Sequence, residues 1–334
     1  MKLHRNLLVS LLLTASLALS CAVSPAEDSD IEYNHVMEAW MRVNYPTVKP
    51  FGTYGAYVLQ MDKGDGASIG DSAYVRVHYT KSMLDGTIVE TNEEELAKQL
   101  GEYKVSSNYA GNTWRLTQGY VPDALEEVIR SMRSGGQATI ALPKTASGHN
   151  ASMYDAFTSS EEANNYIFDL TIDTVINNII SYQDQEMREW FRAHYDSETT
   201  IADHLFFKKL VEKTADTDTI TEGASISVRY IGRLMDGQVF DTNIADTAKF
   251  YRIWNSDNAY SALNVTFYKN DDDKFSSDNN VVSGFGQAIQ HMNYGEKAVA
   301  LFNFELGYGQ NGKNPSIPEY SPLLFWIYIE PSKN

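Results

Sequence analysis

Residues 225–241 read SISVRYIGRLMDGQVFD, a run in which apolar and polar side chains alternate. Ile226, Val228 and Tyr230 recur at every second position, and this period is typical of a strand that buries one face. The Asp236-Gly237 pair that follows is a strong signal for a tight hairpin, because glycine readily takes the positive φ angles of such turns. We therefore expect an antiparallel return strand directly after the turn.

The same pattern occurs once more, closer to the N-terminus. Residues 75–79 (VRVHY) alternate in the same way and precede an Asp85-Gly86 pair. Upstream of each hairpin lies another repeat, because residues 37–45 (MEAWMRVNY) recur as residues 187–195 (MREWFRAHY) at an offset of 150 positions. Both copies predict an amphipathic helix. The chain therefore consists of two similar units, which suits 334 residues at roughly 150 per domain.

Each unit contains further strands and one short helix in the same order. The predicted strands are residues 56–61, 137–142 and 166–172 in the first unit and residues 204–210, 297–304 and 323–329 in the second. Apolar residues at helical spacing predict the short helices, namely Leu125, Ile129 and Met132, and Phe285, Ile289 and Met292. One short helix among antiparallel strands indicates an α+β fold in which the sheet wraps the helix. We expect two such domains, each preceded by an amphipathic helix.

The composition excludes several kinds of partner. The chain has 27 basic and 44 acidic residues, a formal net charge of −17, and nucleic acid repels so acidic a protein. The seven histidines show no metal-ligand spacing, and there is no glycine loop for phosphate. We therefore expect no nucleic acid partner, no metal and no cofactor.

The N-terminus has the pattern of a secretory signal. Lys2 and Arg5 precede an apolar run over residues 7–13, which is shorter than a membrane-spanning helix requires. Cys21, the sole cysteine, ends this segment in the sequence LALSC, which resembles a bacterial lipobox. The plainer alternative is a lone buried thiol behind an ordinary signal.

The lipobox resemblance implies a location for the protein. Residues 1–20 would be a signal peptide, a lipid on Cys21 would anchor the chain in a membrane, and residues 21–33 would be an acidic tether. We expect a lipoprotein of the cell envelope, held at the outer membrane and facing the periplasm or the exterior.

Aromatic and aliphatic residues are spread over the second unit at definite intervals. Tyr230 lies 10 positions before Phe240, Val281 lies 27 before Tyr308, and Tyr308 lies 17 before Phe325. With the motifs VRYIG, DGQVFD, VVSGF and GYG, these intervals resemble the FKBP family of macrolide-binding prolyl isomerases over roughly residues 205–330. The first unit resembles the family more faintly. The implied pocket consists of Tyr230, Phe240, Asp241, Val281, Val282, Phe285, Tyr308, Ile317 and Phe325.

The resemblance implies a role for each pocket residue. Catalysis would fall to Tyr230, Phe240, Asp241, Tyr308 and Phe325, and substrate binding to Val281, Val282, Phe285 and Ile317. Rotation about an X-Pro bond is slow, because its partial double bond gives a barrier of roughly 18–20 kcal/mol. A dry aromatic pocket disfavours the planar, charge-separated amide more than the twisted one.

Two functions follow from this comparison. The first is a peptidyl-prolyl cis/trans isomerase that acts as a foldase on proline-containing envelope polypeptides. The alternative is a binding module that keeps the fold without turnover.

The second unit departs from the family pattern in several places. Phe285 replaces the tryptophan of the best-known members, and Glu319 replaces a proline. Leu263 takes the place of a pocket phenylalanine. Between Asp241 and Val281 lie 39 residues, about twice the usual number, and this insertion holds Tyr251, Trp254 and Tyr260.

The first unit keeps fewer of the pocket residues. Glu90 stands in place of the pocket aspartate, Leu125 replaces the helix aromatic, and no Tyr-Gly pair follows Leu142. We expect an inactive module that retains the fold over residues 34–176, followed by the isomerase domain over residues 177–334.

The last predicted strand is apolar on both faces. Leu324, Trp326 and Tyr328 would point away from the core, and such a patch is rarely left in water. We expect the helix over residues 187–195, or the first domain, to cover this outer face.

Overall fold

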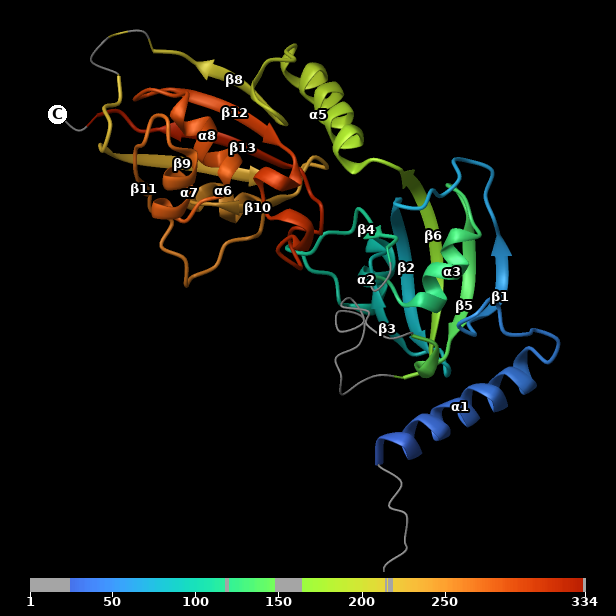
Figure 1. The fold of residues 1–334 in the computed structure, drawn as a ribbon. Coiled ribbons are helices and arrows are strands. Elements are labelled where there is room, and N and C mark those ends of the chain that lie inside the picture. The colour runs from blue at the N-terminus through green and yellow to red at the C-terminus, as the bar shows by residue number, and fades with distance from the viewer. Residues whose placement is uncertain (1–24, 118–119, 148–163, 214, 216–218, 333–334) are drawn as a thin grey trace, which may run out of the picture.

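The computed structural model describes residues 25–117, 120–147, 164–213, 215 and 219–332. Two units lie side by side in Figure 1, coloured blue to green and yellow to red, and each has its own antiparallel sheet. In the described part of the chain, no helix has both the length and the apolar character needed to cross a membrane. The predicted signal peptide and Cys21 lie outside the described residues.

The first unit is a six-stranded sheet in the order β1-β5-β6-β2-β3, with β4 paired to β2. Its strands are β1 (Tyr57–Asp62), β2 (Tyr74–Met83), β3 (Ile88–Thr91), β4 (Asn112–Arg115), β5 (Gln137–Leu142) and β6 (Tyr166–Ile176). Helix α3 (Asp123–Arg130) packs against one face of the sheet and buries Leu125 and Ile129 completely. The short helices α2 (Glu94–Leu100) and η1 (Lys144–Ser147) lie in the connections.

The second unit repeats this plan with seven strands in the order β10-β9-β13-β12-β8-β7, and β11 pairs with β9. Its strands are β7 (Thr200–Ala202), β8 (Leu205–Val211), β9 (Ser225–Arg233), β10 (Val239–Thr242), β11 (Leu263–Thr266), β12 (Lys297–Phe302) and β13 (Leu323–Ile329). Its helices are α6 (Ala245–Phe250), α7 (Asp272–Asn279), α8 (Ser283–Gln290), η3 (Phe304–Leu306) and η4 (Gly309–Asn311). The predicted α+β class, with a short core helix in each domain, is confirmed.

Both Asp-Gly pairs form the expected hairpin turns. Gly86 and Gly237 have φ angles of 89° and 95°, a region that side chains with a Cβ rarely enter. Strands β2 and β3 pair antiparallel on either side of the first turn, as do β9 and β10 around the second.

The repeated amphipathic segments form helices α1 (Pro25–Asn44) and α5 (Ile179–Tyr195). Helix α5 packs its Met187 and Phe191 against the outer face of β8 and β12, whose Phe206 and Leu301 point away from the domain core. Helix α1 begins at Pro25, within the segment predicted as an acidic tether over residues 21–33, so residues 25–33 of that segment are helical. Proline suits the first turn of a helix, where its missing N–H has no partner to lose.

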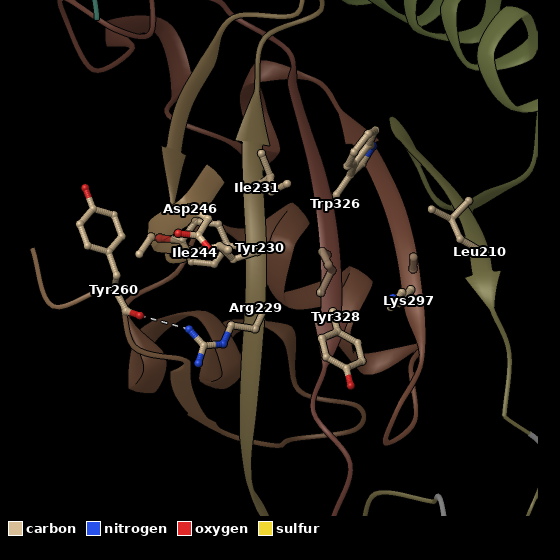
Figure 2. A pocket seen from close by; sticks show the side chains of 13 residues that line it. Leu210, Arg229, Tyr230, Ile231, Ile244, Asp246, Tyr260, Lys297, Trp326 and Tyr328 are labelled. Atoms are coloured by element: carbon tan, nitrogen blue, oxygen red, sulfur yellow. Dashed lines mark hydrogen bonds between the residues drawn. The ribbon is translucent and has the colours of Figure 1, made fainter. Parts of the chain in front are cut away.

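Helix α5 covers only part of the outer face of the second sheet. Leu324 is buried beneath it, but Trp326 remains 39% exposed, so the prediction of full cover is wrong for this half. The Trp326 indole donates a hydrogen bond to the Tyr195 hydroxyl at 2.8 Å, at the end of the helix. Beyond it lies an open groove of about 560 Å³, in which Figure 2 shows Arg229 and Tyr328.

The two units meet through an aromatic cluster and a pair of loops. Tyr320 of the second unit packs edge-on against Tyr74 of the first, with ring centroids 5.1 Å apart, and is 3% exposed. Gln183 on α5 donates a hydrogen bond to the Tyr320 carbonyl oxygen at 2.6 Å. The loop that carries Tyr320 is therefore held against the first unit.

Candidate functional site

Four elements of the second unit enclose a cavity of about 660 Å³, which we call the aromatic pocket. Strand β9 contributes Tyr230, β10 contributes Phe240 and Asp241, α8 contributes Phe285, and β13 contributes Phe325. The loop after β12 adds Tyr308. Residues that are almost a hundred positions apart thus line one space, because β13 pairs with β9 in the middle of the sheet.

The aromatic rings that line the pocket also pack against one another. Phe325 lies at the centre, with ring centroids 5.6 Å from Phe240, 5.0 Å from Phe285 and 6.0 Å from Tyr230. Tilted and edge-to-face pairs at these distances are favourable, by about 0.5–1.5 kcal/mol each beyond the burial of their area. The wall of the pocket is therefore apolar, and its rings are held by contacts with one another.

A glycine on β9 makes room for this wall. A Cβ atom at Gly232 would lie 2.6 Å from two carbons of the Phe240 ring and 3.0 Å from a Phe325 ring carbon. Contacts that short do not occur between real atoms, so any side chain here would displace the Phe240 ring. The glycine of the VRYIG motif thus has a steric purpose in the pocket.

One tyrosine of the pocket has its hydroxyl group fixed by a carboxylate. The Tyr230 hydroxyl donates a hydrogen bond to Asp241 Oδ2 at 2.8 Å. Burial, and then the negative charge of Asp241, raise the pKa of Tyr230. The hydroxyl proton of Tyr230 is therefore already engaged in the hydrogen bond to Asp241.

The hydroxyl of Tyr308 can serve substrate directly. Burial, followed by the Asp241 charge, raises the pKa of Tyr308, so this group is protonated at neutral pH. Lys313 Nζ lies 5.5 Å from the centroid of the Tyr308 ring, within the range of a cation–π contact. Tyr308 thus presents a protonated hydroxyl group among the residues that line the aromatic pocket.

The structure brings together eight of the nine predicted pocket residues. Tyr230, Phe240, Asp241, Val281, Val282, Phe285, Tyr308 and Phe325 line the aromatic pocket, and Leu263 lines it as well. Ile317 does not line it, because its side chain is 1% exposed and packs in the core of the second unit.

Sequence reasoning missed four residues that also line the pocket. They are Asn280, Ser283, Gly307 and Lys313. Asn280, Ser283 and Gly307 adjoin the predicted Val281, Val282 and Tyr308, so proximity in sequence was the available signal. Nothing in the sequence pattern marks Lys313, which lies in an irregular loop.

The first unit has a related tyrosine–carboxylate pair in which the tyrosine is buried. The Tyr79 hydroxyl donates a hydrogen bond to Glu90 Oε1 at 2.6 Å, so Glu90 takes the part that Asp241 has in the second unit. Burial, and then the Glu90 charge, raise the pKa of Tyr79, whose side chain is only 3% exposed. The space beside this pair is lined by Pro315 and Glu319 of the second unit.

A comparison with known protein families agrees with this geometry. The family model described as FKBP-type peptidyl-prolyl cis-trans isomerase matches residues 216–330. This segment is therefore similar to FKBP-type domains. The matched segment contains every residue that lines the aromatic pocket.

Several relatives share part of their length with this chain. It is 28% identical over 154 residues to the "Probable FKBP-type peptidyl-prolyl cis-trans isomerase" of Haemophilus influenzae, which covers 45% of this chain and 53% of that protein. It is 26% identical over 122 residues to FK506-binding protein 1A of Aspergillus fumigatus, which covers 36% of this chain and 89% of that one. The chain thus spans about half the length of the Haemophilus relative.

Among solved structures, the three FKBP domains of wheat FKBP73 align with 83% of this chain and 94% of their own. The sequence identity is 16% and the TM-score is 0.30.

Proposed function

We propose that the protein is a peptidyl-prolyl cis/trans isomerase whose catalytic site is the aromatic pocket of the second unit. The observation that carries this proposal is a preformed apolar wall of Phe240, Phe285 and Phe325 with the Tyr308 hydroxyl as donor at its edge. Membership of residues 216–330 in the isomerase family supports the same reaction. The substrates are proline-containing segments of unfolded polypeptides.

The pocket can accelerate rotation without a covalent step. A planar amide has a charge-separated resonance form that water stabilises, and the twisted transition state has lost it. Transfer into the apolar pocket therefore disfavours the planar state more than the twisted one. The Tyr308 hydroxyl holds a neighbouring carbonyl, and the Tyr230–Asp241 pair fixes the rim of the site.

The test is cis/trans exchange of a proline tetrapeptide, followed by NMR with and without the full chain. Catalysis should raise the exchange rate, and Phe240→Ala should lower kcat/KM by roughly tenfold, because the wall loses about 1.4 kcal/mol of differential binding. The matched control is Val89→Ala, at the corresponding position of the first unit, which should leave the rate unchanged. No acceleration by the wild-type chain would leave a binding module without turnover.

We also propose that Cys21 carries a lipid that holds the protein at the outer membrane of the cell envelope. The support is the sequence alone, namely a sole cysteine at the end of a short apolar signal. Cys21→Ala should move the protein from the detergent phase to the aqueous phase, and Ser24→Ala should not. Unchanged partitioning of Cys21→Ala would show that a lipid on Cys21 does not anchor the protein.

A further inference from the structure

The insertion that sets this chain apart is an ordered part of the second unit. Residues 242–262 include helix α6, in which Ala248 is fully buried. Arg229 on β9 donates hydrogen bonds to the carbonyl oxygens of Asn243 and Tyr260, at 3.0 and 3.2 Å. Both ends of the insertion are thereby fixed to the same strand, beside the aromatic pocket.

A second cavity, which we call the side groove, adjoins the aromatic pocket. Its volume is about 510 Å³, and Phe240 and Asp241 line both cavities, so the two share a wall. The insertion supplies Arg252, Trp254 and Tyr260 to the side groove. The Trp254 and Tyr260 rings are nearly parallel, with an interplanar angle of 11° and centroids 6.5 Å apart, and Trp254 is 48% exposed.

The first unit contributes to the same groove. Val105 and Ser106, in the loop between α2 and β4, line it together with Pro315 of the second unit. Asn108 fixes this loop, because its side chain donates to Gln238 Oε1 at 2.8 Å and its backbone N–H donates to the Pro315 carbonyl at 3.0 Å. The side groove is therefore complete only when both units are present.

We propose that the side groove is a substrate subsite for the polypeptide segment that flanks the isomerised proline. This proposal rests on the isomerase function proposed above. An extended chain advances about 3.3–3.6 Å per residue, so a peptide with its proline in the aromatic pocket reaches the adjoining groove within a few residues. Phe240, Ile253 and Trp254 offer aromatic and aliphatic contacts, which suit an apolar or aromatic side chain.

The preferred substrate is thus an unfolded chain with an apolar residue near the proline. The first unit, in which Tyr79 is buried and hydrogen-bonded to Glu90, acts as one wall of the substrate site instead of as a second catalyst.

The experiment compares two substrates on the full chain, a proline tetrapeptide and a longer peptide that extends the same core with a phenylalanine on either side. The wild-type protein should have a higher kcat/KM for the longer peptide. Trp254→Ala should lower the ratio of kcat/KM for the longer peptide to kcat/KM for the tetrapeptide by about fivefold to tenfold, as expected for the loss of one aromatic contact. Phe250→Ala is the matched control, because Phe250 is 77% exposed on the same insertion and does not line the groove.

A second variant tests the wall that the first unit provides. Ser106→Trp places a large ring in the groove and should also lower this ratio, although no residue of the second unit is changed. Equal kcat/KM values for both peptides in the wild type, or an unchanged ratio in both Trp254→Ala and Ser106→Trp, would overturn the subsite. Failure of the tetrapeptide reaction in the wild type would instead count against the isomerase function itself.

Discussion

The hydroxyl groups of the two tyrosines in the aromatic pocket have different surroundings. Tyr230 donates to Asp241 at 2.8 Å, so its proton is already committed. Tyr308 lines the pocket beside Lys313, and we propose that its hydroxyl group binds substrate. In the proposed mechanism, the hydrogen bond between Tyr230 and Asp241 leaves Tyr308 as the donor to substrate.

Tyr308→Phe should lower kcat/KM for a proline tetrapeptide by roughly tenfold, because one hydrogen bond to the twisted state, worth about 1.4 kcal/mol, is lost. The ring stays, so the wall is kept and circular dichroism should be unchanged. Tyr251→Phe, in the insertion, is the control for removal of a hydroxyl outside the pocket. Normal turnover by the Tyr308→Phe variant would show that Tyr308 is not the hydrogen-bond donor to substrate.

The same tyrosines should make the fold sensitive to alkaline pH. Burial raises the pKa of Tyr230 and of Tyr308 above the usual value near 10, as does the Asp241 charge. A group whose pKa is raised in the folded state adds stability that is complete below about pH 10 and is lost as the pH rises through the folded pKa. The Tm should therefore fall above pH 10, and it should fall less in Tyr230→Phe. An equal decrease in both proteins would contradict this assignment.

At the scale of the element, helix α5 belongs to the second domain's structure and not to a linker. Met187 and Phe191 are fully buried against Phe206, Val299 and Leu301 on the outer face of the sheet. Strand β12 is consequently buried on both faces, since its alternate residues enter the core. A sheet face that would otherwise be exposed to water is thus closed by the segment directly before the domain.

Phe191→Ala should destabilise the protein by about 3–5 kcal/mol, because it removes a fully buried aromatic ring and leaves a cavity. Chemical denaturation measures the change. Glu189→Ala, on the exposed side of the same helix, should have little effect. A small change in Phe191→Ala would mean that α5 is only loosely attached.

At the scale of the whole molecule, the first unit supports the loop that leads from the aromatic pocket back to β13. Tyr320 packs against Tyr74, and Asn108 is hydrogen-bonded to Pro315 and Gln238. These contacts fix the position of this loop, and of residues 236–238, relative to the first unit. The whole chain is therefore expected to be more stable than either part.

A fragment of residues 178–334 should catalyse tetrapeptide exchange, and a fragment of residues 25–177 should not. The boundary lies before α5, because a fragment that begins near Asp196 would expose Phe206 and Leu301. The active fragment should have a lower Tm than the full chain, since Tyr320 loses its cover. Activity in the first fragment would show that its buried Tyr79 and the neighbouring Glu90 can still reach substrate.

The sequence by itself determined the elements and most of the pocket. Alternation at Val228 and Tyr230, the Asp-Gly turns and the repeated helix all depend on neighbours in the chain, so they can be read without coordinates. The eight pocket residues were implied by the resemblance of the second unit to the FKBP family, and the structure places all eight around one cavity.

Only the tertiary structure decided the rest. Ile317 turned into the core while Lys313, four positions earlier, lines the pocket, because both lie in an irregular loop without periodicity. The exposure of Trp326 depends on how far α5 extends over the sheet. Val105 meets Trp254 across the side groove only because two separately folded units are in contact, and such contacts between units leave no periodic signal in the sequence.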